Sequence, residues 1–225
     1  MWQSFQRFCP EYTEICDCQI EYDWHCDLAE IDGFSASKSD LMAYPSIDAM
    51  AQARCQWLIS EVTPERLAAS LAHREIRIIH SPGGSDHFTR YLWDGRLWLM
   101  NSGGSHHTAA AQYLATRLRQ SVPLIGTRYT YSLNPNAIAS LCKAFEMFAI
   151  DRQNPASTNA FHDVMAAFRA TWLWHPLPQP FSEGRAILLP RDESRSMRVA
   201  AVLREAGIAD LGAHLAGLCE RQEQI

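Results

Sequence analysis

The residues best suited to chemistry lie in one short stretch, Gly103-Gly104-Ser105-His106-His107. An apolar run precedes the stretch and an alanine-containing helical pattern follows it, so we expect a strand, a tight turn and the start of a helix. The first turn of a helix has unpaired amide groups and a positive dipole end, and glycines let the backbone approach an anion closely. The stretch therefore predicts a phosphate-binding turn. Glycines placed there for steric reasons and solvated histidines remain the alternative.

Each polar residue of the turn has a predicted role if the ligand is a phosphodiester or ATP. Ser105, His106 and His107 are the candidate catalytic residues, because they supply a hydroxyl and imidazole groups that transfer protons near neutral pH. The predicted phosphate- or nucleotide-binding residues are Asn101, Gly103, Gly104, Ser105, Arg90 and Arg128.

A nucleotide ligand would bring Mg²⁺ with it, because Mg²⁺ usually bridges phosphates. Its carboxylate ligand is not identified by the sequence. Asp86 and Asp94 are nearest, and Asp94-Gly95 is better explained as a hairpin turn.

Two further stretches combine residues that can bind ligands. Cys16, Cys18, His25 and Cys26 suggest zinc, but their spacing is not a common zinc pattern. Strand alternation instead predicts that Cys16 and Cys18 pack on an apolar face, so no metal site is expected. A second Gly-Gly loop with two histidines, at 80–87, either closes over a ligand or is a plain surface loop.

The predicted elements give a mixed α/β (α+β) fold. We expect helices that begin at Ser46 and Thr63, a strand at 75–80, a hairpin around Asp94-Gly95, a helix at 106–120 and a strand at 122–131. From residue 134 the pattern is mostly helical, at 135–149, 157–172, 193–206 and 209–221, with a rigid loop at 175–181 and one late strand at 185–190. The expected division is a core over 1–133 and a helical part over 134–225 packed on that core, or one domain overall.

Charge is unevenly distributed along the 225 residues, whose net charge is −5. Residues 1–40 hold nine Asp and Glu against two basic residues, whereas residues 64–130 hold eight arginines against four acids. An anionic ligand is therefore expected in the middle of the chain. The acidic overall balance excludes a generally basic nucleic-acid coat. No apolar run is long enough to cross a bilayer and no signal-peptide core is evident, so a cytoplasmic protein without membrane insertion is expected.

The stretch "NSGGSHHTAAAQYL…SVPLIGTRY" resembles the signature of the ParB/sulfiredoxin superfamily over about residues 96–128. The resemblance implies a mixed sheet with flanking helices, here with a helical C-terminal extension. Ser105 stands where sulfiredoxin has its reactive cysteine, which excludes the thiolate chemistry of sulfinic-acid reduction. His107 stands where an arginine is usual.

Within that superfamily the chain is most similar to plasmid fertility-inhibition factors, through "CQIEYDWHC…DGF" and "LWDGRLWLMNSGGSHH". That similarity implies suppression of conjugative transfer of a competing plasmid or T-DNA through a type IV secretion route. It also implies nucleotide hydrolysis or DNA cleavage, with DNA and a coupling ATPase or secretion component as partners. Two alternatives stay open. One is a non-catalytic inhibitor of a coupling ATPase, and the other is a ParB-like, nucleotide-gated DNA-binding module.

Overall fold

The computed structural model describes residues 5–150, 155–178 and 181–225, which form two compact units. One unit comprises residues 18–132 together with Ile225, and the other comprises the segment before residue 18 together with residues 133–224. Both units combine helices with a sheet, which confirms the expected mixed α/β class. The expected domain division at residues 133 and 134 stays a prediction.

The first unit is built on a five-stranded mixed sheet with the order β1-β5-β3-β4-β2. Its strands are β1 (Cys16–Asp27), β2 (Gly33–Phe34), β3 (His87–Tyr91), β4 (Leu97–Met100) and β5 (Pro123–Leu133). The predicted hairpin is confirmed: β3 and β4 pair antiparallel, and Gly95 has a φ of 73° in the turn. β3 runs parallel to β5, and β2 runs parallel to β4.

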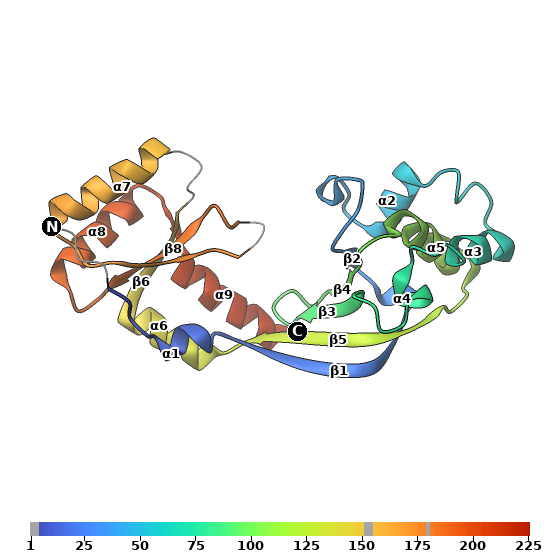
Figure 1. The fold of residues 1–225 in the computed structure, drawn as a ribbon, viewed down its shortest axis with the longest axis horizontal. Helices are drawn as coiled ribbons and strands as arrows, with labels where there is room; N and C mark the ends of the chain where they lie inside the picture. The colour runs from blue at the N-terminus through green and yellow to red at the C-terminus, as the bar shows by residue number, and fades with distance from the viewer. Residues whose placement is uncertain (1–4, 151–154, 179–180) are drawn as a thin grey trace. The chain divides into compact units, whose positions relative to one another are not determined.

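Three helices of this unit position the candidate site: α2 (Ile47–Arg54), α3 (Pro64–Leu71) and α5 (Ser105–Leu118). Ser46 and Thr63 cap α2 and α3 as the sequence predicts, because each hydroxyl accepts a hydrogen bond from a first-turn amide. α5 packs against both helices (Figure 1). Ala109, Ala110 and Ala111 of α5 are fully buried, and such small side chains allow the elements around α5 to approach closely.

The remaining short elements of this unit are η1 (Leu28–Glu30), η2 (Leu41–Ala43) and α4 (Arg77–His80). The predicted strand at 75–80 is wrong, since α4 is a single helical turn there. Ile76 and Ile78 are buried and Ile79 packs against the same core. A short run of apolar residues that pack against a core is compatible with a short helix as well as with a strand, so the pattern alone does not distinguish the two.

The predicted burial of the first half of β1 is also wrong. Cys16 and Cys18 are exposed, as are Ile20 and Tyr22, although the segment is a strand as expected. Contact with the hydrophobic core of this unit begins at Trp24, which meets Phe88 edge to face. The alternation of apolar and polar residues identified the strand, but it did not indicate how much of the strand is buried by the rest of the unit.

The second unit contains a four-stranded antiparallel sheet with the order β7-β8-β6-β9. The strands are β6 (Phe145–Ile150), β7 (Leu173–Pro176), β8 (Arg185–Pro190) and β9 (Ala209–Asp210). The helices are α1 (Pro10–Thr13), α6 (Pro135–Ala144), α7 (Pro155–Phe168), α8 (Ser194–Glu205) and α9 (Leu211–Gln224). Two hydrophobic clusters flank the sheet, one including residues of α7 and α8 and the other including residues of α1, α6 and α9.

The expected helical C-terminal part is therefore corrected to an α/β unit. Strand β8 was predicted, but the predicted helix at 135–149 ends at Ala144 and continues as β6. Phe145 and Met147 join one cluster and Phe148 joins the other, which is the alternation of a strand buried on both faces. The predicted rigid loop at 175–181 begins within β7, and its residues 179–180 lie outside the described residues.

Candidate functional site

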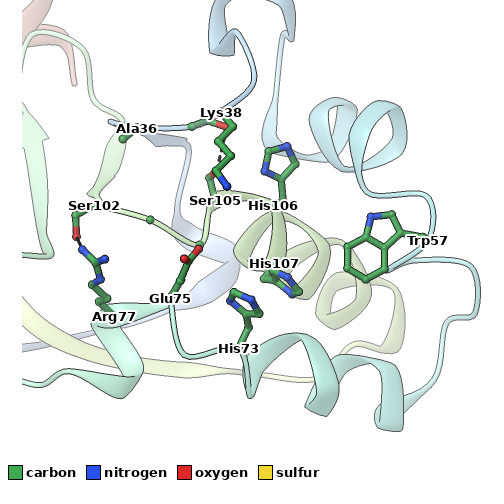
Figure 2. Close-up of a pocket in the computed structure, with 13 residues that line it drawn as sticks. Ala36, Lys38, Trp57, His73, Glu75, Arg77, Ser102, Ser105, His106 and His107 are labelled. Carbon is green, nitrogen blue, oxygen red and sulfur yellow. Dashed lines mark hydrogen bonds between the residues drawn. The ribbon is translucent and has the colours of Figure 1, made fainter.

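A cavity of about 560 Å³ lies at the N-terminus of α5, within the unit of residues 18–132 (Figure 2). The predicted turn supplies one wall, and the chain before α4 supplies another. The lining residues are Ala36, Ser37, Lys38, Trp57, His73, Glu75, Arg77, Ser102, Gly103, Gly104, Ser105, His106 and His107.

The turn between β4 and α5 depends on the glycine at position 104. Gly104 has a φ of 70°, and a Cβ at this position would lie 2.5 Å from the carbonyl oxygen of Glu75. Both facts exclude larger residues, because the left-handed region disfavours side chains and a main-chain neighbour cannot move cheaply. Gly103 is less constrained, since its nearest neighbour would be 3.6 Å away. The turn thus lies directly against the segment that carries Glu75.

The first amide groups of α5 are available to a ligand. No side chain caps this helix. The first helical hydrogen bond is donated by the Thr108 amide to the carbonyl oxygen of Gly104, at 2.9 Å. Among the described residues, the amides of Ser105, His106 and His107 have no acceptor. Unpaired first-turn amides at the positive end of a 14-residue helix attract an anion.

His107 stacks on His73, with ring centroids 3.6 Å apart and an interplanar angle of 10°. Trp57 meets His107 edge to face, at 5.7 Å between centroids. The Nδ1 atoms of both histidines are buried without a hydrogen-bond partner in the described part of the chain. Burial lowers the pKa of His107, and His73 lowers it further while Glu75 opposes the shift. His107 is therefore neutral at neutral pH.

His106 also lines the cavity, and in Figure 2 its ring points away from that of His107. Its Nε2 lies 2.9 Å from Ser39 Oγ, and Arg54 Nε donates a hydrogen bond to the same hydroxyl at 3.3 Å. Burial lowers the pKa of His106, and the nearby charges of Arg54 and Lys38 lower it further. His106 is thus also neutral at neutral pH, in contrast to a permanent cationic phosphate clamp.

Ser105 is buried at the start of α5, and its hydroxyl donates a hydrogen bond to Ser37 Oγ at 2.9 Å. This contact ties the turn to the segment that carries Lys38. Arg77 donates to Ser102 Oγ, and Ser102 in turn donates its hydroxyl and its amide to Asp86. Asp86 is therefore engaged in holding the turn.

Three predicted binding residues do not line the cavity. Asn101 is 5% exposed, and its amide group bonds the main chain of Ala36 and the carbonyl of Gly103, so it holds two loops together. Arg128 donates to Glu21 at 2.7 Å and its guanidinium lies over the Trp24 ring. Arg90 lies in β3 opposite Leu97, at the end of the strand pair nearer the hairpin turn, and does not line the cavity.

Sequence reasoning missed the partners that come from outside the turn. These are Ser37, Lys38, Trp57, His73, Glu75 and Arg77, and within the turn Ser102 was also missed. A signal was present, because His73, Glu75 and Arg77 alternate immediately after α3, at the point where the chain passes the turn. The sequence instead predicts a strand at 75–80, which includes Glu75 and Arg77 but not His73.

Among the described residues that line the cavity, Glu75 alone carries a carboxylate. Asp94 is the hairpin residue, as predicted, and binds Arg96 and Trp98. The described residues contain no cluster of three His, Cys, Asp or Glu side chains with the geometry of a metal site. One carboxylate still fits Mg²⁺ that arrives with a nucleotide, because such ions take most of their ligands from phosphates and water.

Comparisons with known proteins place the chain in a family without assigning it an activity. Within the described part of the chain, no helix has the length and apolar character needed to span a membrane. No curated protein and no solved structure matches the sequence or the fold. A family model described as a family of unknown function (DUF6685) matches residues 21–225, and the chain belongs to that family.

Proposed function

We propose that the cavity at the N-terminus of α5 binds a phosphoryl group of a nucleotide or of DNA and hydrolyses its phosphoester or phosphoanhydride bond. One observation carries the proposal: three unpaired helix amides and two neutral imidazoles border the same cavity. Lys38 and Arg77 add positive charge around it, against the single negative charge of Glu75. A cavity with this balance favours an anion.

Binding follows from the turn itself. The amides of Ser105, His106 and His107 donate to phosphoryl oxygens, and the ammonium group of Lys38 neutralises part of their charge. Gly104 lets the turn that carries these amides lie directly against the main chain of Glu75, because it has no side chain on that side. Trp57 supplies an aromatic surface at the edge of the cavity, and more than half of its side chain is exposed.

Hydrolysis requires a base for the attacking water. The neutral imidazole of His107 accepts the proton at Nε2, because its Nδ1 is buried and out of reach of the attacking water. Glu75 stabilises the imidazolium that results, since its charge raises the pKa of His107. His106, held by Ser39, also lines the cavity; it takes up a proton from solvent and donates it to the leaving oxygen.

Mg²⁺, when bound with a nucleotide, would be held by Glu75 and would neutralise charge on the phosphate oxygens. Lys38 and the helix amides supply that neutralisation from the chain itself, whether or not a metal ion accompanies the ligand.

We propose further that the biological role is that of a fertility-inhibition factor of the ParB/sulfiredoxin superfamily, acting in the cytoplasm on DNA or on a component of a type IV secretion route. The sequence resemblance of the stretch from Asn101 to Tyr129 supports this role, together with the cavity at the turn. Blocking of conjugative transfer then depends on the phosphoryl chemistry of the cavity.

The test is to incubate the purified protein with labelled single-stranded DNA, double-stranded DNA and ATP, with and without Mg²⁺. Wild-type protein should cleave at least one of these substrates, and the double variant His106→Ala, His107→Ala should lose that activity by 100-fold or more (about two orders of magnitude for general acid–base groups). His25→Ala is the matched control, because His25 is exposed on β1 and outside the cavity.

The same variants should be expressed in donor cells in a conjugation assay. Loss of transfer inhibition in the double-histidine variant supports a catalytic inhibitor. Full inhibition by that variant, with no cleavage by wild-type protein, overturns the enzymatic proposal in favour of a non-catalytic inhibitor. Salt-dependent, sequence-specific DNA binding without turnover would favour the ParB-like module.

A further inference from the structure

The proposed phosphoryl site shares its cavity with a wall of three aromatic rings. Trp57 meets His107 edge to face, with ring centroids 5.7 Å apart, and His107 stacks on His73 at 3.6 Å. All three rings line the cavity (Figure 2), and His107 also contributes one of the unpaired amides at the start of α5. A site for an anion and a surface for a flat ring therefore lie side by side.

Trp57 is the most exposed tryptophan among the described residues. It is 66% exposed, and Trp174, the next, is 50% exposed. An indole carries a large apolar surface, and keeping that surface in water costs free energy that a stacked ligand would recover. The cavity thus has an aromatic face that the protein itself leaves uncovered.

The main chain on both sides of Trp57 is anchored, although its indole is not. Cys55 is fully buried, Leu58 is buried, and both belong to the hydrophobic core of this unit. The amide of Leu58 donates to the carbonyl oxygen of Cys55 at 2.8 Å, and the amide of Ile59 donates to the same oxygen at 3.1 Å. The turn is fixed while it presents the indole at the cavity, so little ordering opposes a ligand that stacks there.

The ligand that matches both features carries a phosphoryl group and a flat ring. The helix amides bind the phosphoryl group, and the exposed indole stacks on the ring. Burial lowers the pKa of His107, so the imidazole beside Trp57 is neutral and suits an uncharged ring such as a nucleobase. The cavity volume of about 560 Å³ lies in the range of roughly 300–1,000 Å³ that holds whole small ligands, so there is room for a nucleotide.

We infer that the cavity recognises a nucleotide whose base has a free face, with the phosphoryl group on the first amides of α5 and the base stacked on Trp57. The inference rests on the proposed phosphoryl binding, and it adds the residue that selects for a base. A base within a duplex is stacked on its neighbours and presents no free face. The source is therefore a free nucleotide or single-stranded nucleic acid, and both present the same phosphate and ring.

Isothermal titration of the full chain with adenosine 5′-monophosphate, thymidine 5′-monophosphate and ribose 5-phosphate tests the inference. Ribose 5-phosphate has the phosphoryl group without a base. Both nucleotides should bind about 10-fold more tightly than ribose 5-phosphate, which is what one stacked base contributes. Trp57→Ala should remove this difference and leave the affinity for ribose 5-phosphate unchanged, which also shows that the variant is folded.

Two further variants define the role of the ring. Trp57→Phe should keep most of the preference for nucleotides, because phenylalanine retains an aromatic face. Trp174→Ala is the matched control, because Trp174 is also an exposed tryptophan but lies outside this cavity. It should bind the nucleotides as wild-type protein does.

A single-stranded thymidine oligonucleotide distinguishes the two sources. Tighter binding than that of thymidine 5′-monophosphate, weakened in Trp57→Ala, identifies single-stranded nucleic acid, and equal or weaker binding identifies the free nucleotide.

Nucleotides that bind no more tightly than ribose 5-phosphate, or a Trp57→Ala variant that weakens all three ligands alike, overturn the inference and leave phosphoryl binding by the wild-type protein intact. Tighter binding of phenyl phosphate than of either nucleotide overturns it in favour of a phosphorylated aromatic side chain. Binding of none of these ligands overturns the proposed phosphoryl site together with the inference.

Discussion

Two neutral histidines and one carboxylate define the chemistry of the cavity at the residue scale. His107 has His73 stacked on one face, and Glu75 is close enough to raise its pKa against the effect of burial. His106 is held by Ser39 and lies near two cations. The two imidazoles are therefore chemically distinct, and only His107 has a carboxylate that stabilises its protonated form.

The lowered pKa values of the two histidines predict how stability depends on pH. Each histidine binds a proton less readily in the folded state than in the unfolded state, whose pKa is near 6.5. The unfolded state therefore binds more protons as the pH falls through this value, and the free energy of unfolding decreases on acidification. Urea denaturation at a series of pH values between about 8 and 5 measures the slope.

The double variant His106→Gln, His107→Gln should show a flatter pH dependence than wild-type protein over this range, since it removes both groups. Equal slopes in the two proteins would contradict the account of the buried, neutral histidines.

The residues of the turn could be found from sequence, but their partners could not. Gly104, Ser105 and His106 are adjacent along the chain, so their types and order are visible together. His73 and His107 are separated by more than thirty residues, and nothing local specifies that their rings stack. Asn101 was expected to bind ligand because it follows a strand, yet its amide is used to join two loops.

At the scale of elements, the turn between β4 and α5 is fixed by its contact with the segment before α4. Asn101, Ser102 and Gly104 each bond or closely contact a different neighbouring segment. The loop geometry therefore depends on several elements, and it presents the first amides of α5 to the cavity.

Gly104→Ala should destabilise the protein by about 2–4 kcal/mol, because the new Cβ would be in a left-handed conformation and 2.5 Å from a carbonyl oxygen. Thermal or urea denaturation measures the change. Gly83→Ala is the matched control. Gly83 has a φ of 77° with open space around it, so only the conformational cost of about 1 kcal/mol applies. Equal losses in the two variants would show that the close approach to Glu75 does not matter.

Local signals predicted several elements correctly. The caps Ser46 and Thr63 and the Asp94-Gly95 turn act through neighbours a few residues away, so the sequence contains the whole signal. The strand β6 was missed because Phe145, Met147 and Phe148 also fit a helical seam, and only the two clusters that flank the sheet distinguish the possibilities.

At the scale of the whole molecule, each of the two units has its own hydrophobic core, and each has a cavity. The unit of residues 133–224 also has a charged network. Glu146 is buried, and its carboxylate binds Arg191 and Arg204 at 2.9 Å each. Removal of one partner from such a buried ion pair lowers the free energy of unfolding, because the remaining charge has no partner.

Glu146→Gln should destabilise the protein by about 2 kcal/mol, less than a fully buried pair would cost, because both arginines are about half exposed. Hydrogen exchange should show lost protection within residues 133–224 and little change within residues 18–132. Glu220→Gln, at an exposed position of α9, is the control. Equal loss of protection in both units would contradict the division into two compact units.

The central claim is that the first amides of α5 bind a phosphoryl group. Titration of the ¹⁵N-labelled protein with inorganic phosphate and with ATP, followed by NMR of the Ser105, His106 and His107 amides, tests it most directly. The account predicts saturable shifts at these three amides, weakened in Lys38→Gln. Amide resonances that stay unchanged at saturating ligand, or shifts confined to residues outside the cavity, would contradict it.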